Sequence, residues 1–330
     1  MATRTTVLKR TIEGLYRPHR KHEILFQGTF QSHWAHPDLV EIVKQTQNAT
    51  TTSSTMPSAP LTVEIPDSVY SFSAFTSEFV KLLTEEIANF YAASERFDIP
   101  IHRPNSMNKY GVVVNEIGLR PLISSFQQDY LWPISKVLFP QEATPKFDGH
   151  HSFIVRYQAD EDLGLDMHTD DSDVTFNVCL GETFTGSTLT FCGEFGAANH
   201  RQYTHQYHHQ VGRAILHLGS RRHGADDIDT GRRMNLIVWN HNSVWRASSQ
   251  YRELKHGMGY QREQGLPSKV CLSYTHDVDY LAYHDDLPER AKTLQLHPWC
   301  PPPGMEYEGF EDQLRAKDKK KKTRDPVDEL

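Results

Sequence analysis

The chain has 330 residues, which is enough for one large domain with extensions or for two domains. Apolar residues make up 38% of it and the mean hydropathy is −0.59, so part of the chain is expected to lie outside a packed core. The formal net charge of −7 argues against a nucleic-acid binder that relies on bulk basicity, and no apolar run reaches the length of a membrane-spanning helix.

The sequences at both ends of the chain and the spacing of its cysteines indicate the expected cellular compartment. Residues 1–21 are basic but lack an apolar stretch, so no secretory signal is expected. The final VDEL differs from an ER-retrieval signal in its first residue and is not expected to act as one. The four cysteines form no C-x-x-C pair, which favours a reducing compartment over a disulfide framework. We therefore expect a soluble intracellular protein, in the cytoplasm or the nucleus.

Two helices are predicted in the first half of the chain. Residues 1–45 show no clear hydrophobic period, and the Thr/Ser-rich stretch 46–60 is typical of a flexible linker. Thr76 is a plausible N-cap for the helical apolar stripe that follows it. A second helix is predicted over 121–139, where Pro133 is a candidate break. The polar loop 103–110 between these helices fits either one wall of a substrate mouth or a folded connector.

Beyond residue 150 the hydrophobic period changes to two, which predicts β-strands. Apolar and polar residues alternate in 153–157 and in 174–180. Further short strands are predicted at 188–191, 214–218 and 235–239, with glycines between them. Short, closely spaced strands with glycine turns indicate a sandwich or a jelly roll. The lysine-rich end of the chain is typical of a solvated tail.

His168 and Asp170 lie two residues apart, just before the predicted strand 174–180. In an extended segment, residues two apart share a face, so the imidazole and the carboxylate are expected on the same side. They supply two of the three ligands of the arrangement of two histidines and one carboxylate that binds Fe(II) and leaves coordination positions open. Asp171 is a rival carboxylate by proximity, but its parity along the strand is wrong.

The third ligand is expected from the His-rich stretch 200–223. His223 follows the predicted strand 214–218, and Arg233 comes ten residues later (233 − 223 = 10). A guanidinium near the metal can bind a carboxylate through two hydrogen bonds. A chelating metal and a separate cation together suit a dicarboxylate with a 2-oxo acid end, which is 2-oxoglutarate.

Alternatives remain open for several of these positions. His217 competes for the third-ligand role, but its place inside an apolar strand suits a supporting hydrogen-bonded role better. Arg232 is the alternative carboxylate anchor. Asn177 and Leu189 either line the pocket or are ordinary strand residues. The remaining histidines from 200 to 209 lack the usual zinc-ligand spacing and cysteine partners.

Two long runs of sequence carry a family resemblance. FIVRYQADEDLGLDMHTDDSDVTFNVCLGETFTGSTLTFCG and VGRAILHLGSRRHGADDIDTGRRMNLIVW resemble the prolyl-4-hydroxylase-type Fe(II)/2-oxoglutarate dioxygenases. The resemblance implies an α+β fold, with a double-stranded β-helix (jelly-roll) core and supporting N-terminal helices. It also implies that His168, Asp170 and His223 bind iron, that Arg233 anchors the C5 carboxylate of 2-oxoglutarate, and that Tyr157 lies near this co-substrate.

The resemblance further implies a reaction. Oxidative decarboxylation of 2-oxoglutarate to succinate, with O₂, would be coupled to hydroxylation of a second substrate, and ascorbate is the expected reductant. A protein side chain is the expected substrate; a small-molecule substrate, or a catalytically silent jelly roll that binds metal or ligand, are the alternatives. No nucleic-acid or membrane partner is expected. The expected organisation is an N-terminal segment with linker (1–62), a helical support region (63–148), the β-helix core (149–245) and a C-terminal extension (246–330).

Overall fold

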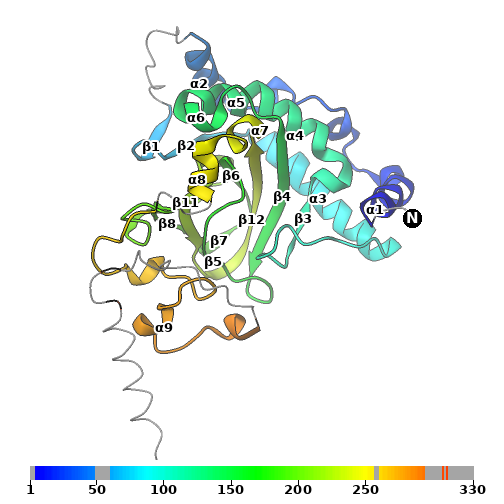
Figure 1. Ribbon diagram of the computed structural model, residues 1–330. Helices are drawn as coiled ribbons and strands as arrows, with labels where there is room; N and C mark the ends of the chain where they lie inside the picture. Colours follow the sequence, from blue (N-terminus) through cyan, green and yellow to red (C-terminus); the bar gives the residue numbers. More distant parts are fainter. Residues whose placement is uncertain (1–3, 49–59, 256–259, 294–306, 308–309, 311–330) are drawn as a thin grey trace, which may run out of the picture.

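Two antiparallel sheets and a layer of helices make up the described part of the chain (Figure 1). The computed structural model describes residues 4–48, 60–255 and 260–293, together with Tyr307 and Phe310. The larger sheet has eight strands in the order β1-β2-β10-β6-β12-β4-β3, with β7 paired to β12. The smaller sheet has four strands in the order β5-β11-β8-β9. The fold is thus a sheet-rich α+β arrangement.

The five strands predicted beyond residue 150 are present as β4, β6, β8, β10 and β12, and each is longer than predicted. The bounds of the strands are β1 Thr62–Ile65, β2 Val69–Ser73, β3 Gly111–Val113, β4 Gly149–Gln158, β5 Leu165–His168, β6 Val174–Gly181, β7 Phe184–Gly186, β8 Leu189–Glu194, β9 Tyr203–Tyr207, β10 Arg213–Leu218, β11 Arg221–Ala225 and β12 Ile228–His241. The long strand β12 pairs with both β4 and β6, so it lies between them inside the larger sheet.

Helices α1 to α6 lie on the outer side of the larger sheet, α7 and α8 follow β12, and α9 lies in the C-terminal segment, away from this layer (Figure 1). Their bounds are α1 Arg4–Thr11, α2 Pro37–Asn48, α3 Ser77–Phe97, α4 Arg120–Phe126, α5 Trp132–Leu138, α6 Pro140–Ala143, α7 Ser243–Arg246, α8 Ser249–Lys255 and α9 Tyr280–Tyr283. The Thr76 hydroxyl accepts a hydrogen bond from the Phe79 amide at the start of α3, so the predicted cap is confirmed. Pro133 lies in the first turn of α5, directly after the π-helical turn Gln127–Leu131 that follows α4, so the predicted helix is interrupted close to this proline.

Alternate residues of the central strands enter two separate cores. On β12, Leu236 and Val238 belong to the core beneath the helices, whereas Ile237 belongs to the core between the two sheets. On β4, Ile154 faces the helices and Phe153 faces the smaller sheet. The larger sheet is therefore covered on both faces, and its inner face looks onto the strands that carry His168 and His223.

Residues 4–48 pack into the helical core, although their sequence shows no clear period. The side chains of Tyr16 and Trp34 are fully buried in it. The Glu86 carboxylate on α3 accepts hydrogen bonds from the Tyr16 hydroxyl and from the amides of Lys21 and His22. Most of the predicted linker 46–60, and the lysine-rich tail with its VDEL end, lie outside the described residues.

The prediction that the cysteines stay unpaired is wrong for two of them. Cys192 on β8 and Cys271 form a disulfide across 79 residues of sequence. The fold brings the C-terminal segment against the smaller sheet, and local spacing gives no sign of this approach. The pairing removes the cysteine argument for a reducing compartment. Within the described ranges, no helix combines the length and the apolar character needed to cross a membrane.

Candidate metal and co-substrate site

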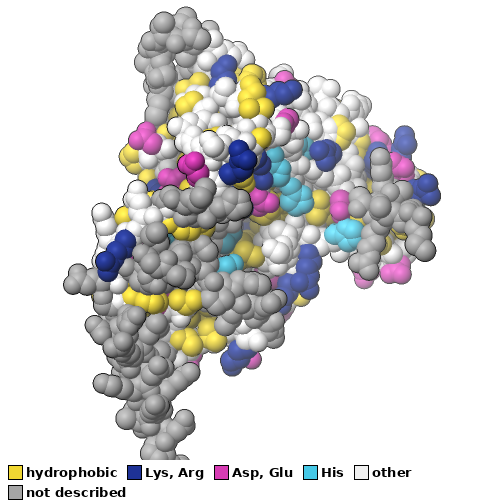
Figure 2. Space-filling view, viewed as in Figure 1, with side chains coloured by type: hydrophobic (Ala, Val, Ile, Leu, Met, Phe, Trp, Pro, Cys, Tyr) yellow, Lys and Arg dark blue, Asp and Glu magenta, His cyan; other side chains and the backbone are white. Residues whose placement is uncertain are grey.

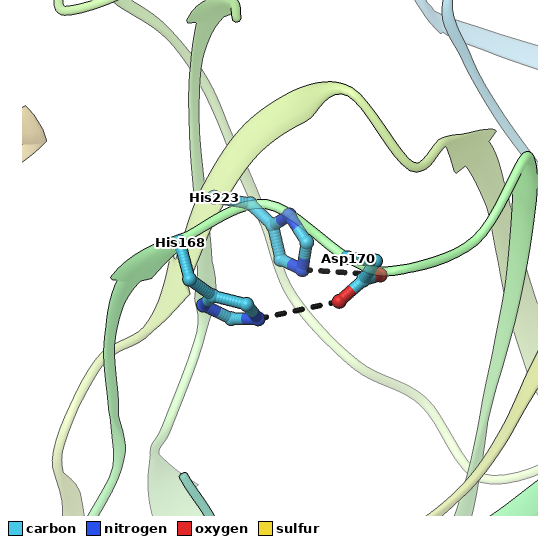
Figure 3. A group of neighbouring side chains, drawn as sticks. All are labelled: His168, Asp170 and His223. Carbon is cyan, nitrogen blue, oxygen red and sulfur yellow. Dashed lines mark ion pairs between the residues drawn. The ribbon is translucent and has the colours of Figure 1, made fainter. Parts of the chain in front are cut away.

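Strands β5 and β11 bring His168, Asp170 and His223 together (Figure 3). His168 ends β5 and is paired directly with His223 of β11, while Asp170 lies in the loop that follows β5. One ligand atom from each residue lies within 4.8 Å of the other two. The Asp170 carboxylate oxygens lie 3.4 Å from His168 Nε2 and 3.7 Å from His223 Nε2.

Backbone carbonyls fix the orientation of both imidazoles. His168 Nδ1 is 2.7 Å from the Asp166 carbonyl oxygen, and His223 Nδ1 is 2.9 Å from the Arg221 carbonyl oxygen. Each Nδ1 therefore carries the proton and donates it, which leaves each Nε2 directed at the shared centre. The Thr175 hydroxyl donates to Asp170 Oδ2 at 2.6 Å. Two nitrogen donors and one carboxylate, each held by a hydrogen bond with a residue outside the cluster, fit a divalent iron ion.

Burial and mutual contact set the protonation of these three residues. Burial lowers the pKa of His223 to about 3. Burial also tends to lower the pKa of His168, but the hydrogen bond to Asp170 and its negative charge have the larger effect, so the pKa of His168 is raised. Burial would raise the pKa of Asp170, yet His223 and His168 hold it below its ordinary value. The carboxylate is thus ionised, and a metal ion would displace the remaining proton from His168.

Arg233 on β12 reaches the same cavity from the larger sheet. Its side chain is 1% exposed, and Nη1 donates to the Ser187 carbonyl oxygen at 2.6 Å and to the Ser187 hydroxyl at 2.9 Å. Nε donates to Asn235 Oδ1 at 3.0 Å. Both partners are neutral, and among the described residues no carboxylate forms an ion pair with Arg233. The site therefore contains a buried cation that no carboxylate of the described residues pairs with.

Tyr157 lies beside Arg233, as its partner in the β4–β12 register. The Arg233 guanidinium carbon is 5.1 Å from the centre of the Tyr157 ring. Asn108 Nδ2 donates to the Tyr157 hydroxyl oxygen at 3.2 Å, and burial raises the pKa of the phenol. Tyr157 is therefore neutral, and its own proton is available to a group in the cavity.

Each rival position makes a different contact, although Asp171 also borders the cavity. The Arg232 side chain is partly exposed and forms an ion pair with Glu182. Asp171 is largely exposed and pairs with Arg246. His217 is buried behind the site: its Nδ1 contacts the Leu218 carbonyl oxygen at 2.9 Å, and its ring packs edge-on against His223. None of these three side chains joins the cluster of candidate metal ligands.

The ligands and the arginine line one cavity of about 310 Å³. Figure 2 shows histidine side chains in and beside a hollow on this face of the molecule. Residues 105–108 form part of the wall, as do Asn177 and Leu189, whose roles the sequence left open. Sequence reasoning missed His151, Ile237 and Trp239, which also line it. Strand parity was the available signal for all three: Ile237 and Trp239 share a strand face with Arg233, and His151 shares one with Tyr157.

Comparisons with known proteins identify the family. Residues 12–144 match the model of the OGFOD2-like domain. The chain is 34% identical over 244 residues to 2-oxoglutarate and iron-dependent oxygenase domain-containing protein 2 of Danio rerio, an alignment that covers 74% of this chain and 67% of that protein. The chain belongs to this oxygenase family. Its human relative of the same name is 36% identical over 220 residues, or 64% of this chain.

The match to several members of this family is partial. The chain covers 62% of the length of the human relative and 46% of protein CP2 of Arabidopsis thaliana, which is 38% identical over 183 residues and 54% of this chain. Among solved structures, a prolyl 4-hydroxylase of Phytophthora capsici is 12% identical to this chain, with a TM-score of 0.44. The alignment covers 71% of this chain and 77% of that protein's chain.

Proposed function

We propose that the protein is an Fe(II)- and 2-oxoglutarate-dependent dioxygenase. It would couple oxidative decarboxylation of 2-oxoglutarate, which yields succinate and CO₂, to hydroxylation of a second substrate. Family membership supports iron and 2-oxoglutarate as the ligands. We also propose that the two facing sheets form a double-stranded β-helix, with residues 149–245 as the catalytic core, because all five candidate site residues lie within that range.

The observation that carries the proposal is the unpaired Arg233 in the cavity of the three metal-ligand candidates. A buried charge without a partner is unfavourable, so an anionic ligand is expected to neutralise it. The neighbouring triad suits a chelating 2-oxo acid, and Arg233 suits a carboxylate at the far end of the same molecule. 2-Oxoglutarate contains both groups.

Each residue then has a defined task. His168, Asp170 and His223 would hold the iron, which when bound supplies the redox chemistry that activates dioxygen. Arg233 would bind the C5 carboxylate, and Tyr157 would donate its phenol proton to the same carboxylate. Ser187 and Asn235 keep the guanidinium in place before the ligand arrives. This preorganisation lowers the cost of binding.

For the second substrate we propose a protein side chain. The cavity lining combines the loop residues Asn105 and Asn108 with Trp239 and His151. A lining with such polar groups suits the amide and carbonyl groups of a polypeptide, whereas a closed apolar pocket would suit a small molecule. Ascorbate is proposed as the reductant that keeps the iron in its ferrous state.

Succinate formation tests the proposal directly. Purified full-length protein with Fe(II), ascorbate and 2-oxoglutarate should release succinate slowly even without a second substrate. His168→Ala and Asp170→Ala should each abolish this release, because the cluster would keep only two ligands. Asp171→Ala is the matched control and should retain it. Equal release from all four proteins would refute the assignment of the metal ligands.

The anchor role is tested by a neighbouring pair of arginines. Arg233→Met should raise the 2-oxoglutarate concentration needed for half-maximal succinate release by about ten- to a hundredfold, since a charge-assisted hydrogen bond contributes about 1.5–3 kcal/mol. Arg232→Met removes the same charge outside the cavity and should leave the requirement unchanged. The reverse result would move the anchor to Arg232.

A further inference from the structure

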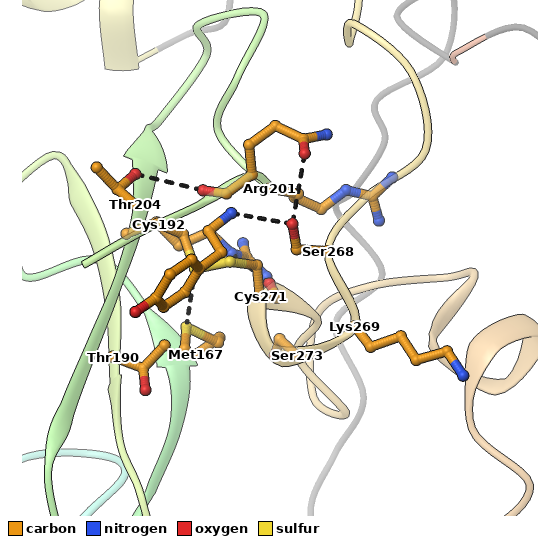
Figure 4. Close-up of a disulfide and its surroundings, with 12 residues drawn as sticks. Met167, Thr190, Cys192, Arg201, Thr204, Ser268, Lys269, Cys271 and Ser273 are labelled. Atoms are coloured by element: carbon orange, nitrogen blue, oxygen red, sulfur yellow. Dashed lines mark hydrogen bonds between the residues drawn. A yellow bond between two sulfur atoms is a disulfide. The ribbon is translucent and has the colours of Figure 1, made fainter. Parts of the chain in front are cut away.

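A C-terminal segment, residues 263–279, contacts the sheet that carries both candidate histidine ligands (Figure 4). Its Cys271 is joined by a disulfide to Cys192 on β8. Met167, which directly precedes His168, packs against this disulfide, with its sulfur 3.9 Å from Cys192 Sγ. The segment does not line the metal-site cavity, so it touches the ligand strands from outside.

The segment's first contact with a ligand strand is through Asp166 on β5. The buried carboxylate of Asp166 accepts hydrogen bonds from the Ser273 hydroxyl at 2.6 Å and the Thr275 hydroxyl at 2.7 Å. It also accepts from the amides of Thr275 and Tyr274, at 3.1 and 3.3 Å. The carbonyl oxygen of the same Asp166 orients the His168 ring. One residue therefore connects the C-terminal segment to a metal-ligand candidate.

The second contact is through Arg222 on β11, the residue before His223. Neighbouring residues of a strand point to opposite faces, so Arg222 faces the C-terminal segment when His223 faces the cavity. Arg222 Nε donates to the Cys271 carbonyl oxygen at 2.9 Å, and Nη2 donates to Asp277 Oδ2 at 2.8 Å. The same carboxylate oxygen accepts from the Ser273 amide at 2.9 Å. Ser273 thus takes part in both contacts.

We propose that Asp166 and Arg222 are positioning residues, through which the C-terminal segment fixes the two imidazoles in their metal-binding orientation. This inference rests on the proposed function, because it assumes that His168 and His223 bind metal. Groups that orient metal ligands from behind typically change metal affinity 10- to 100-fold when they are removed. The C-terminal segment is accordingly part of the metal site even though it supplies no ligand.

Metal affinity distinguishes positioning from ordinary structural support. Co(II) is the probe, because its visible absorption reports both the amount bound and the coordination geometry. Thr275→Val removes one hydroxyl donor to Asp166, and we expect Co(II) affinity to fall about tenfold with an altered spectrum. Thr275→Ser keeps the hydroxyl and should restore both properties. Arg222→Lys, which cannot reach both of its acceptors in the same way, should also weaken Co(II) binding.

A matched control separates affinity from stability. Thr46 in α2 is buried and donates its hydroxyl to the Val43 carbonyl oxygen at 2.7 Å, far along the chain from the metal site. Thr46→Val makes the same chemical change and should leave Co(II) affinity at the wild-type value. If Thr275→Val binds Co(II) as tightly as wild type, the positioning role is overturned. If wild-type protein itself does not bind Co(II), the proposed function fails instead.

Discussion

Arg201 and Arg233 are both fully buried, yet the protein surrounds them in opposite ways. Arg201 Nε and Nη2 donate to the two carboxylate oxygens of Glu263, at 2.6 and 2.5 Å, and Nη1 donates to Asp279 at 2.5 Å. The partners of Arg233 are instead a serine and an asparagine. The charge of Arg201 is balanced by two carboxylates, whereas no carboxylate among the described residues pairs with Arg233.

This difference in partners indicates that Arg201 belongs to a structural ion-pair cluster and Arg233 to a binding site. Around Arg201, the acids come from the C-terminal part of the chain, so the ion pairs fix that part to the loop between β8 and β9. Around Arg233, the neutral partners hold the side chain still without satisfying its charge. A buried cation of this kind is unfavourable until an anion arrives. Sequence composition cannot make the distinction, since both residues are simply arginines in a Gly- and His-rich region.

The largest loss of stability is expected at Arg201. Arg201→Met leaves Glu263 and Asp279 buried without their cation, and breaking a buried pair from one side typically costs about 3–5 kcal/mol. Urea unfolding followed by circular dichroism measures the change in the free energy of unfolding. A loss below about 1 kcal/mol would show that the two carboxylates are not held as ion pairs.

Removal of the disulfide is expected to have the next largest effect. Cys192 and Cys271 close a loop of 79 residues, and the double variant Cys192→Ala/Cys271→Ala should lose about 2–4 kcal/mol of unfolding free energy. Reduction of the wild-type protein should lower its stability similarly, while the reductant should not affect the double variant. Sensitivity of that variant to reductant would assign the effect to another group.

His200 makes the Arg201 cluster sensitive to acid. Burial, followed by the charges of Arg222 and Arg201, lowers its pKa from 6.5 to about 3. Between pH 6.5 and about pH 3, His200 is protonated in the unfolded chain but neutral in the folded protein. The free energy of unfolding therefore decreases as the pH falls through this range. From about pH 7 to about pH 5 the loss should be about 2 kcal/mol. His200→Asn should reduce this dependence, as measured by urea unfolding at both pH values; an unchanged slope would exclude His200 as its source.

The smallest change in stability is expected at Arg233. Arg233→Met removes a buried charge with which no carboxylate in the described part of the chain pairs, so without 2-oxoglutarate the unfolding free energy should change by less than about 1 kcal/mol or rise. The same denaturation measurement compares it with Arg201→Met. A loss as large as that of Arg201→Met would mean that Arg233 supports the fold, and the contrast between the two arginines would disappear.

Much of the larger sheet and of the site was predictable because short-range patterns determine it. The alternation around Phe153 and Phe176 reflects a sheet whose two faces enter different cores. The two-residue spacing of His168 and Asp170 predicted that they lie on one side, and they do, although Asp170 lies in the loop after β5 and not in a strand. Thr76 marked the start of α3 through local capping chemistry. In each case the physical cause lies within a few residues of sequence.

Other features depend on contacts between distant segments. Trp34 and Tyr16 are buried because α3 meets them, and no period within residues 1–45 shows this. The approach of Cys271 to Cys192 follows from how the C-terminal segment crosses the smaller sheet. The direct pairing of His168 with His223 depends on the β5–β11 register, which spacing along the chain does not determine. Sequence therefore indicated the candidate ligands but not what surrounds them.

Binding of 2-oxoglutarate, measured by titration calorimetry without dioxygen, tests the central claim most directly. Mn(II) serves as the metal, because it can occupy the same ligands without turnover. Wild-type protein should bind 2-oxoglutarate when Mn(II) is present and much more weakly without it. Asp170→Ala should lose the dependence on metal, and Arg233→Met should weaken binding about ten- to a hundredfold. Equal binding by all three proteins, with and without Mn(II), would contradict the account.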